Sequence, residues 1–204
     1  MNFNCMNIIK SSVDGPGKRD FILLKNCPLD CKYCINKLAL KEAPNISLSP
    51  KKLIFKIEKD YDMFRKYKSG VSFGGGETLL QYKQLLEFDK LFPIEFTILI
   101  ETSLNVAPKD FKIFLDNVNL NRILFLIDIK DINNEIYEEY TGISNKNVLY
   151  NLNILNLYGL QDKCKIRIPY IKNFNTIENM KKSEEYLYNL GFKDLQKFKY
   201  MVIK

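Results

Sequence analysis

Short runs of β-branched and aromatic residues alternate with longer segments of helical spacing along the 204 residues of the chain. Strands are predicted at residues 21–25, 70–73, 96–101, 123–129, 165–170 and 198–203. Strands that alternate with helices pair in parallel through right-handed crossovers. Six strands are too few to close an eight-stranded barrel. The sequence therefore predicts an α/β fold, either an open partial barrel or a doubly wound sheet.

Capping residues predict where the helices begin. Ser49 followed by Pro50 is typical of a helix start, and apolar spacing continues this helix to Phe64. Four further helices are predicted. One follows Glu77, one begins near Pro108, one spans 145–158, and one begins at Asn175, with Glu178 as the capping partner of Asn175.

Length and composition favour a single domain over residues 1–204. The chain has no apolar run of the roughly 18 residues that span a membrane, and residues 1–10 are too polar for a signal peptide, so we expect a cytoplasmic protein without a membrane partner. The net charge of +7 is spread along the chain, which favours a solvated surface or an acidic protein partner. No nucleic-acid-binding motif accompanies it, and no nucleic acid is expected.

Three of the five cysteines, Cys27, Cys31 and Cys34, lie within eight residues, while Cys5 and Cys164 are remote. An odd number of cysteines without a signal peptide argues against a disulfide framework. Thiolates select zinc, Cu(I) or iron–sulfur clusters. A structural zinc site needs four ligands, and the chain contains no histidine to supply the fourth. An iron–sulfur cluster is the prediction, with zinc or inert thiols as the alternatives.

Glycines and polar residues lie at or near the carboxyl ends of several predicted strands. They comprise Gly74, Gly75, Gly76 and Glu77 after the second strand, Glu101 at the end of the third, Asp128 to Lys130 at the end of the fourth, and Arg167 in the fifth. Because the carboxyl ends of parallel strands meet at one edge, these side chains are expected to share one site with the cysteine loop.

The cysteine motif, C-x3-C-x2-C with Tyr33 before the last cysteine, resembles the signature of the radical SAM superfamily. Four further segments are similar to motifs of its glycyl-radical-enzyme activating enzymes: DGPGKR at 14–19, VSFGGGE at 71–77, DIK at 128–130 and TGISN at 141–145. Arg167 with Asn175 matches the fifth strand and its loop. The ordered set covers about residues 13–179.

The resemblance implies an open partial (β/α)6 TIM-like barrel of parallel strands with one 4Fe–4S cluster on Cys27, Cys31 and Cys34. Its open iron would bind S-adenosylmethionine (SAM), whose reductive cleavage gives methionine and a 5′-deoxyadenosyl radical that abstracts hydrogen. The implied partners are a glycyl radical enzyme as protein substrate and a flavodoxin or ferredoxin as electron donor.

The resemblance also implies site residues. SAM would contact Tyr33, Gly74, Gly75, Gly76, Glu77, Asp128, Lys130 and Arg167. A monovalent cation beside SAM would bind Glu101, Thr102 and Asp128. The substrate loop would meet Asp14, Gly15, Pro16, Gly17 and Arg19. In this interpretation Glu77 accepts from the SAM ammonium, while Lys130 and Arg167 hold its carboxylate.

Several positions depart from the family pattern. Gly74 replaces the usual Ser, Asn26 a common Gly, and Glu101 a shorter Asp. The family often carries a His near its C-terminus, which is missing here, so the adenosine end of the site is expected to be built differently or completed by a partner. The alternatives are a radical SAM enzyme acting on a peptide, small molecule or nucleotide, and a non-catalytic cluster protein. Cys164 is a weaker candidate hydrogen donor, with burial its simpler explanation.

Overall fold

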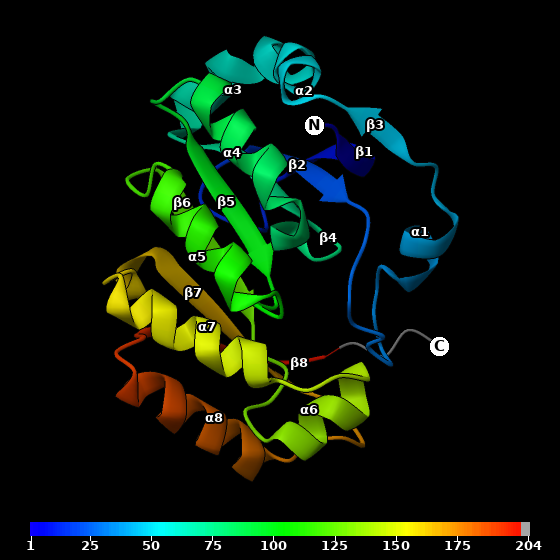
Figure 1. Cartoon of the computed structure of the whole chain (residues 1–204), viewed down its shortest axis with the longest axis vertical. Helices are drawn as coiled ribbons and strands as arrows, with labels where there is room; N and C mark the ends of the chain where they lie inside the picture. The colour runs from blue at the N-terminus through cyan, green and yellow to red at the C-terminus, as the bar shows by residue number, and fades with distance from the viewer. Residues whose placement is uncertain (201–204) are drawn as a thin grey trace.

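Six parallel strands and two antiparallel ones form one open sheet in the computed structural model, which describes residues 1–200 (Figure 1). The strand order is β3-β1-β2-β4-β5-β6-β7-β8, so β3 and β8 are its two edges. The parallel strands are β2 (Arg19–Leu24), β4 (Gly70–Gly75), β5 (Thr97–Thr102), β6 (Ile123–Asp128), β7 (Cys164–Tyr170) and β8 (Asp194–Lys199). The predicted open partial barrel of parallel strands is confirmed.

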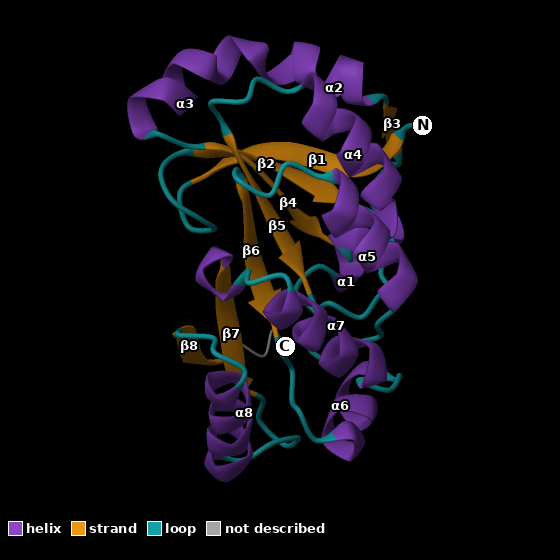
Figure 2. Cartoon of the chain, turned by 60° about the vertical axis from the view of Figure 1, so that its left-hand side comes forward, coloured by secondary structure: helices purple, strands orange, loops and turns teal. Residues whose placement is uncertain are grey.

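The crossover helices lie side by side over one face of this sheet, which leaves the opposite face as the interior of the partial barrel (Figure 2). The helices are α1 (Lys37–Glu42), α2 (Pro50–Ile57), α3 (Tyr61–Tyr67), α4 (Tyr82–Leu91), α5 (Pro108–Asn117), α6 (Asn134–Thr141), α7 (Lys146–Leu157) and α8 (Ile177–Asn189). Short 3-10 turns are η1 (Glu58–Asp60), η2 (Thr78–Gln81) and η3 (Gln161–Lys163).

Aromatic side chains fill the space between the sheet and its helices. Phe73 of β4 meets Phe88 of α4 edge to face, with ring centroids 5.1 Å apart, and stacks on Phe3 at 5.4 Å. Each buried aromatic side chain contributes about 1.5–3 kcal/mol through the apolar surface it removes from water. This core fixes the outer face of the strands and so sets where their carboxyl ends lie.

Two antiparallel strands were not predicted. β1 (Phe3–Ser11) pairs with β2, and β3 (Ile46–Leu48) pairs with β1. Polar residues interrupt the apolar alternation of β1, and the register shifts between Cys5 and Asn7, so the sequence carries a weak strand signal there.

Some predicted element boundaries were wrong. The helix starting after Ser49 is interrupted by η1 and resumes as α3, and α8 is capped by Thr176 with Asn179 rather than by Asn175 with Glu178. The last strand is β8, which begins at Asp194 and not at residue 198, because its alternating polar residues hide it. Positions 201–203 of that prediction lie outside the described residues. Among residues 1–200, no helix has the length and apolar character needed to cross a membrane.

Candidate functional site

The loop between β2 and α1 brings the three clustered cysteines together. Cys27, Cys31 and Cys34 line one cavity of about 330 Å³, roughly ten times the volume that a water molecule occupies. Within residues 1–200, no three His, Cys, Asp or Glu side chains are arranged to hold a metal ion. Three soft donors around a space of this size suit a multi-iron cluster better than a single ion.

Burial keeps two of these thiols protonated. It raises the pKa of Cys31 to about 11 and that of the Cys27 thiol to about 12, although Cys27 as a whole residue is exposed. A metal centre binds thiolates, so loading the loop with a cluster would release protons.

The C-terminal end of α6 supports the cysteine loop. The backbone amide of Asp30 donates to the Thr141 carbonyl at 2.8 Å, and that of Lys32 donates to the Tyr140 carbonyl at 3.1 Å. The Thr141 hydroxyl in turn donates to the Tyr137 carbonyl at 2.7 Å, which fixes the turn that follows α6. The TGISN segment thus shapes the loop from outside.

Tyr33 anchors the same loop through its ring. It packs edge to face against Tyr140 and Phe174, with centroids 6.1 and 5.6 Å away. The predicted SAM contact of Tyr33 therefore belongs to a side chain that is already held within an aromatic cluster.

The glycine run lies against the first residues of the cysteine loop. A Cβ on Gly76 would lie 2.2 Å from the Asn26 carbonyl oxygen, so only glycine fits there. The amide of Glu77 donates to the same carbonyl at 2.8 Å. Asn26 itself has a φ of 73°, a left-handed conformation that Asn tolerates better than most residues, which explains its place at a position where Gly is common. At Gly76, one of the three glycines predicted to contact SAM, the backbone thus packs against the cysteine loop.

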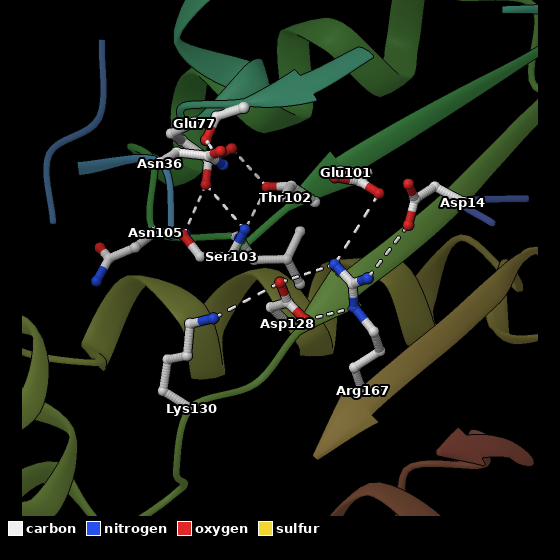
Figure 3. Close-up of polar contacts among 12 residues, drawn as sticks. Asp14, Asn36, Glu77, Glu101, Thr102, Ser103, Asn105, Asp128, Lys130 and Arg167 are labelled. Atoms are coloured by element: carbon white, nitrogen blue, oxygen red, sulfur yellow. Dashed lines mark hydrogen bonds and ion pairs between the residues drawn. The ribbon is translucent and has the colours of Figure 1, made fainter. Parts of the chain in front are cut away.

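Glu77 is buried and accepts four hydrogen bonds from the protein (Figure 3). The donors are the Thr102 hydroxyl at 2.6 Å, the Ser103 hydroxyl at 2.6 Å, the Ser103 amide at 2.9 Å and the Leu79 amide at 3.2 Å. Burial raises the pKa of Glu77, and these donors oppose that shift. A carboxylate has about four lone-pair positions, so its predicted contact with the SAM ammonium would have to displace one of these donors.

Asp128 and Lys130, at and just beyond the carboxyl end of β6, form an ion network with Arg167 from the middle of β7 (Figure 3). Arg167 donates two hydrogen bonds to Asp128, from Nε at 2.6 Å and from Nη2 at 2.9 Å. Lys130 Nζ lies 3.6 Å from Asp128 Oδ2. Burial works against the charged form of Asp128, but both cations outweigh it and lower its pKa.

Among the described residues, Lys130 has unused hydrogen-bond donors. It is buried, with its ammonium 5.4 Å from the centre of the Tyr200 ring, and within residues 1–200 its Nζ makes no hydrogen bond. Burial opposes its charge, yet Asp128 and neighbouring groups raise its pKa. A buried ammonium with unused donors is suited to an anionic ligand.

Of the residues predicted to bind a monovalent cation, Glu101 and Asp128 both face Arg167, whereas the Thr102 hydroxyl is bound elsewhere. Glu101 and Thr102 are consecutive on β5 and so point to opposite faces. The Thr102 hydroxyl donates to Glu77, and Arg167 occupies both oxygens of Asp128. The side chains of Glu101, Thr102 and Asp128 thus do not converge on one point, and the cation site stays a prediction.

Glu101 is predicted to make stability fall as pH rises. Burial raises its pKa to about 8, against the partial offset of Arg167, while the unfolded value is about 4.3. The folded chain therefore binds the proton more tightly, and the free energy of unfolding declines between about pH 4 and about pH 8. The urea concentration at the midpoint of unfolding should fall more steeply with rising pH for the wild type than for Glu101→Gln. Equal slopes would contradict the assignment.

The predicted substrate segment consists of a surface turn and of a buried arginine that supports this turn. Asp14 reaches the ion network, with Oδ1 3.6 Å from Arg167 Nη1, and Gly15 and Gly17 have φ values of 104° and 74°. Arg19 is completely buried, and its guanidinium donates to the Pro16 carbonyl at 3.2 Å. Arg19 thus supports the turn from beneath, and its contact with substrate stays a prediction.

Three polar residues of the site were not predicted to take part in it. Ser103 binds Glu77, and Asn105 donates to the Tyr137 hydroxyl at 3.1 Å and to the Ser144 carbonyl at 2.9 Å. Asn36 donates to the Gly75 carbonyl at 3.0 Å. Ser103 and Asn105 directly follow a predicted strand end, which was the available signal.

The remaining cysteines lie apart from the cysteine loop. Cys5 and Cys164 are buried, and burial raises the pKa of each thiol to about 12. Cys164 is the first residue of β7, three residues before Arg167, and donates to the Leu160 carbonyl at 3.2 Å. Both are explained by packing.

Comparisons with known proteins agree with these motifs. The sequence pattern of the radical SAM superfamily matches residues 21–183. The pyruvate formate-lyase-activating enzyme of Clostridium pasteurianum is 31% identical over 130 residues, which cover 64% of this chain and 53% of that protein. The 4-hydroxyphenylacetate decarboxylase activating enzyme of Clostridioides difficile strain 630 is 25% identical over 224 residues, covering 79% and 70% respectively. The chain thus spans about half the length of the first relative.

Solved structures share the fold at low identity. Streptococcus suis SuiB bound to precursor peptide SuiA superposes with a TM-score of 0.65 at 18% identity, covering 86% of this chain and 37% of that one. The AdoMet-bound anSMEcpe gives a TM-score of 0.58 at 17% identity, covering 85% and 49%. The family resemblance predicted from the motifs is confirmed.

Proposed function

The chain belongs to the radical SAM superfamily, and from this premise we propose that it binds one 4Fe–4S cluster and SAM and installs a glycyl radical on a partner enzyme. The observation that carries the proposal is the single cavity lined by Cys27, Cys31 and Cys34 at the strand edge that also holds Lys130. Both curated relatives described above are named as activating enzymes, which favours this substrate class over a free peptide or small molecule.

The three thiolates would hold the cluster, which when bound supplies the electron that breaks a C–S bond of SAM. The residues of this chain bind SAM and orient it. Lys130, with its donors unused within residues 1–200, would hold the SAM carboxylate. Glu77 would fix the segment after β5 through Ser103 and Thr102, so that it positions the amino end of SAM without contacting it.

Lys130→Met is expected to retain the cluster and to weaken SAM binding. A charge-assisted hydrogen bond contributes about 1.5–3 kcal/mol, so the dissociation constant for SAM should rise roughly 10- to 100-fold. Titration of the reconstituted protein with SAM, followed by EPR, measures it. Lys83→Met, at an exposed lysine of α4, is the matched control. Equal affinity in both variants would refute the role of Lys130.

The partners follow from the same proposal. The glycine loop of a glycyl radical enzyme would approach the inner face of the barrel, where Asp14 and Arg167 lie. A flavodoxin or ferredoxin would deliver the electron, and the net charge of +7 suits an acidic protein of this kind.

The test is anaerobic incubation of the reconstituted chain with SAM, a reductant and a candidate glycyl radical enzyme encoded beside it. A glycyl radical EPR signal whose hyperfine splitting changes with deuterated glycine supports activation. Deoxyadenosine formation that depends on a short precursor peptide, without a protein glycyl radical, would contradict it and favour peptide modification.

A further inference from the structure

Three carboxylates surround one guanidinium on the inner face of the barrel. Asp14 comes from the turn after β1, Glu101 from β5 and Asp128 from β6, and all face Arg167 of β7 (Figure 3). Asp128 receives two hydrogen bonds, while the nearest oxygens of Asp14 and Glu101 lie 3.6 and 4.0 Å from guanidinium nitrogens.

We propose that the Arg167 guanidinium is the permanent counter-ion of this carboxylate group, so that the chain folds and binds SAM without the monovalent cation that its resemblance to the activating enzymes implies. The inference goes beyond the proposed reaction. It rests on that reaction only where SAM binding is the readout.

The first argument is that two of the three predicted ligands, Asp128 and Thr102, are already committed. A hard cation needs several oxygens directed at one point. Asp128 presents both of its oxygens to the planar fork of Arg167, the geometry in which a guanidinium binds a carboxylate most strongly. The Thr102 hydroxyl is turned to the other face of β5, where it donates to Glu77.

The second argument is the space that Glu101 occupies. A Cβ on residue 74 would lie 2.5 Å from Glu101 Oε2 and 2.6 Å from the Phe21 ring, so Gly74 makes room for the longer acidic side chain. The extra methylene of Glu relative to Asp extends its carboxylate towards Arg167. Gly74 and Glu101 thus compensate each other. Each departs from the family pattern, and the small residue makes room for the longer one.

The third argument is the charge balance. Lys130 also lies beside Asp128, at 3.6 Å, so two cations face three carboxylates. Within residues 1–200, Glu101 Oε1 is buried without a hydrogen-bond partner. Each carboxylate of the group thus lies within 4.0 Å of a cation that the chain itself supplies.

The test compares KCl, NaCl and choline chloride at an equal ionic strength of about 0.1 M, so that general screening is constant. Choline is too large to take a small-cation site. For the wild type, the thermal unfolding midpoint without cluster and the SAM dissociation constant with cluster are expected to be the same in all three salts. A saturable K⁺ or Na⁺ effect on either quantity, of roughly 5 °C or tenfold, would overturn the inference.

Arg167→Gln is the converse experiment. Removing the guanidinium leaves the carboxylates facing Lys130 alone, so K⁺ or Na⁺ is expected to raise its unfolding midpoint relative to choline by several degrees. Arg65→Gln, at an exposed arginine, is the matched control and should show no salt difference. An Arg167→Gln protein that is indifferent to the cation would also overturn the inference.

The unfolding readout separates this inference from the proposed reaction, because it needs neither the cluster nor SAM. A wild type that fails to cleave SAM, yet is equally stable in all three salts, would refute the reaction and leave the role of Arg167 standing. Should Arg167→Gln fail to fold, the wild-type comparison alone decides.

Discussion

Alanine at Cys27, Cys31 or Cys34 is expected to abolish the iron–sulfur cluster, which is the largest effect that we anticipate from any single substitution. The three thiols line one cavity, and within residues 1–200 Cys5 and Cys164 are buried elsewhere, so neither can replace a lost ligand without refolding the loop. Iron and sulfide content after anaerobic reconstitution, together with the visible absorption spectrum, measures the loss.

Cys5→Ala and Cys164→Ala are the matched controls, since they remove a buried thiol without touching the loop. Each should retain a full cluster and lose about 1 kcal/mol of stability from the vacated volume. A full cluster in any one of the three loop variants would contradict the ligand assignment.

Arg19→Met is expected to give the largest loss of stability without loss of the cluster ligands. All five guanidinium donors are satisfied: the acceptors are the Ser72 hydroxyl, the Thr97 hydroxyl and the carbonyls of Pro16, Val71 and Thr97. Burial without a carboxylate partner lowers its pKa to about 10. Methionine matches the length of the side chain but leaves buried acceptors unpaired, which costs about 1–3 kcal/mol for each group that finds no new partner.

Urea unfolding of the cluster-free chain tests this prediction. The midpoint of Arg19→Met should fall well below that of the wild type, whereas Arg65→Met, at an exposed arginine, should leave it unchanged. Arg19→Lys should not restore it, because one ammonium cannot reach five acceptors spread over three segments. If Arg19→Met unfolded like Arg65→Met but lost turnover, Arg19 would be a substrate contact, as the sequence first indicated.

The position of the site was predictable because topology fixes it. Once the strands are parallel, their carboxyl ends must share an edge, and this places the cysteine loop and Asp128 together. The register of β6 and β7 then pairs Asp128 with Arg167. The apolar runs that define those strands give a strong sequence signal, because the strands are buried against aromatic residues such as Phe88. Ser49 and Pro50 likewise marked a helix start that the structure reproduces.

The partners of individual side chains were not predictable in the same way. Arg19 reads as a surface residue from its charge, and its burial depends on how the turn before β2 folds over β4 and β5. The partner of Glu77 depends on the path of the chain after β5, which brings Ser103 beneath it. The direction of the Thr102 side chain was predictable, since the alternation of side chains along a strand separates it from Glu101.

The most direct test of the central claim is an anaerobic assay of SAM cleavage by the reconstituted and reduced protein. We expect 5′-deoxyadenosine to form and the EPR spectrum of the reduced cluster to change when SAM is added, with both effects absent from Cys31→Ala. A reduced cluster whose spectrum ignores SAM, without deoxyadenosine, would contradict the account and favour a cluster-binding protein that does not turn over SAM.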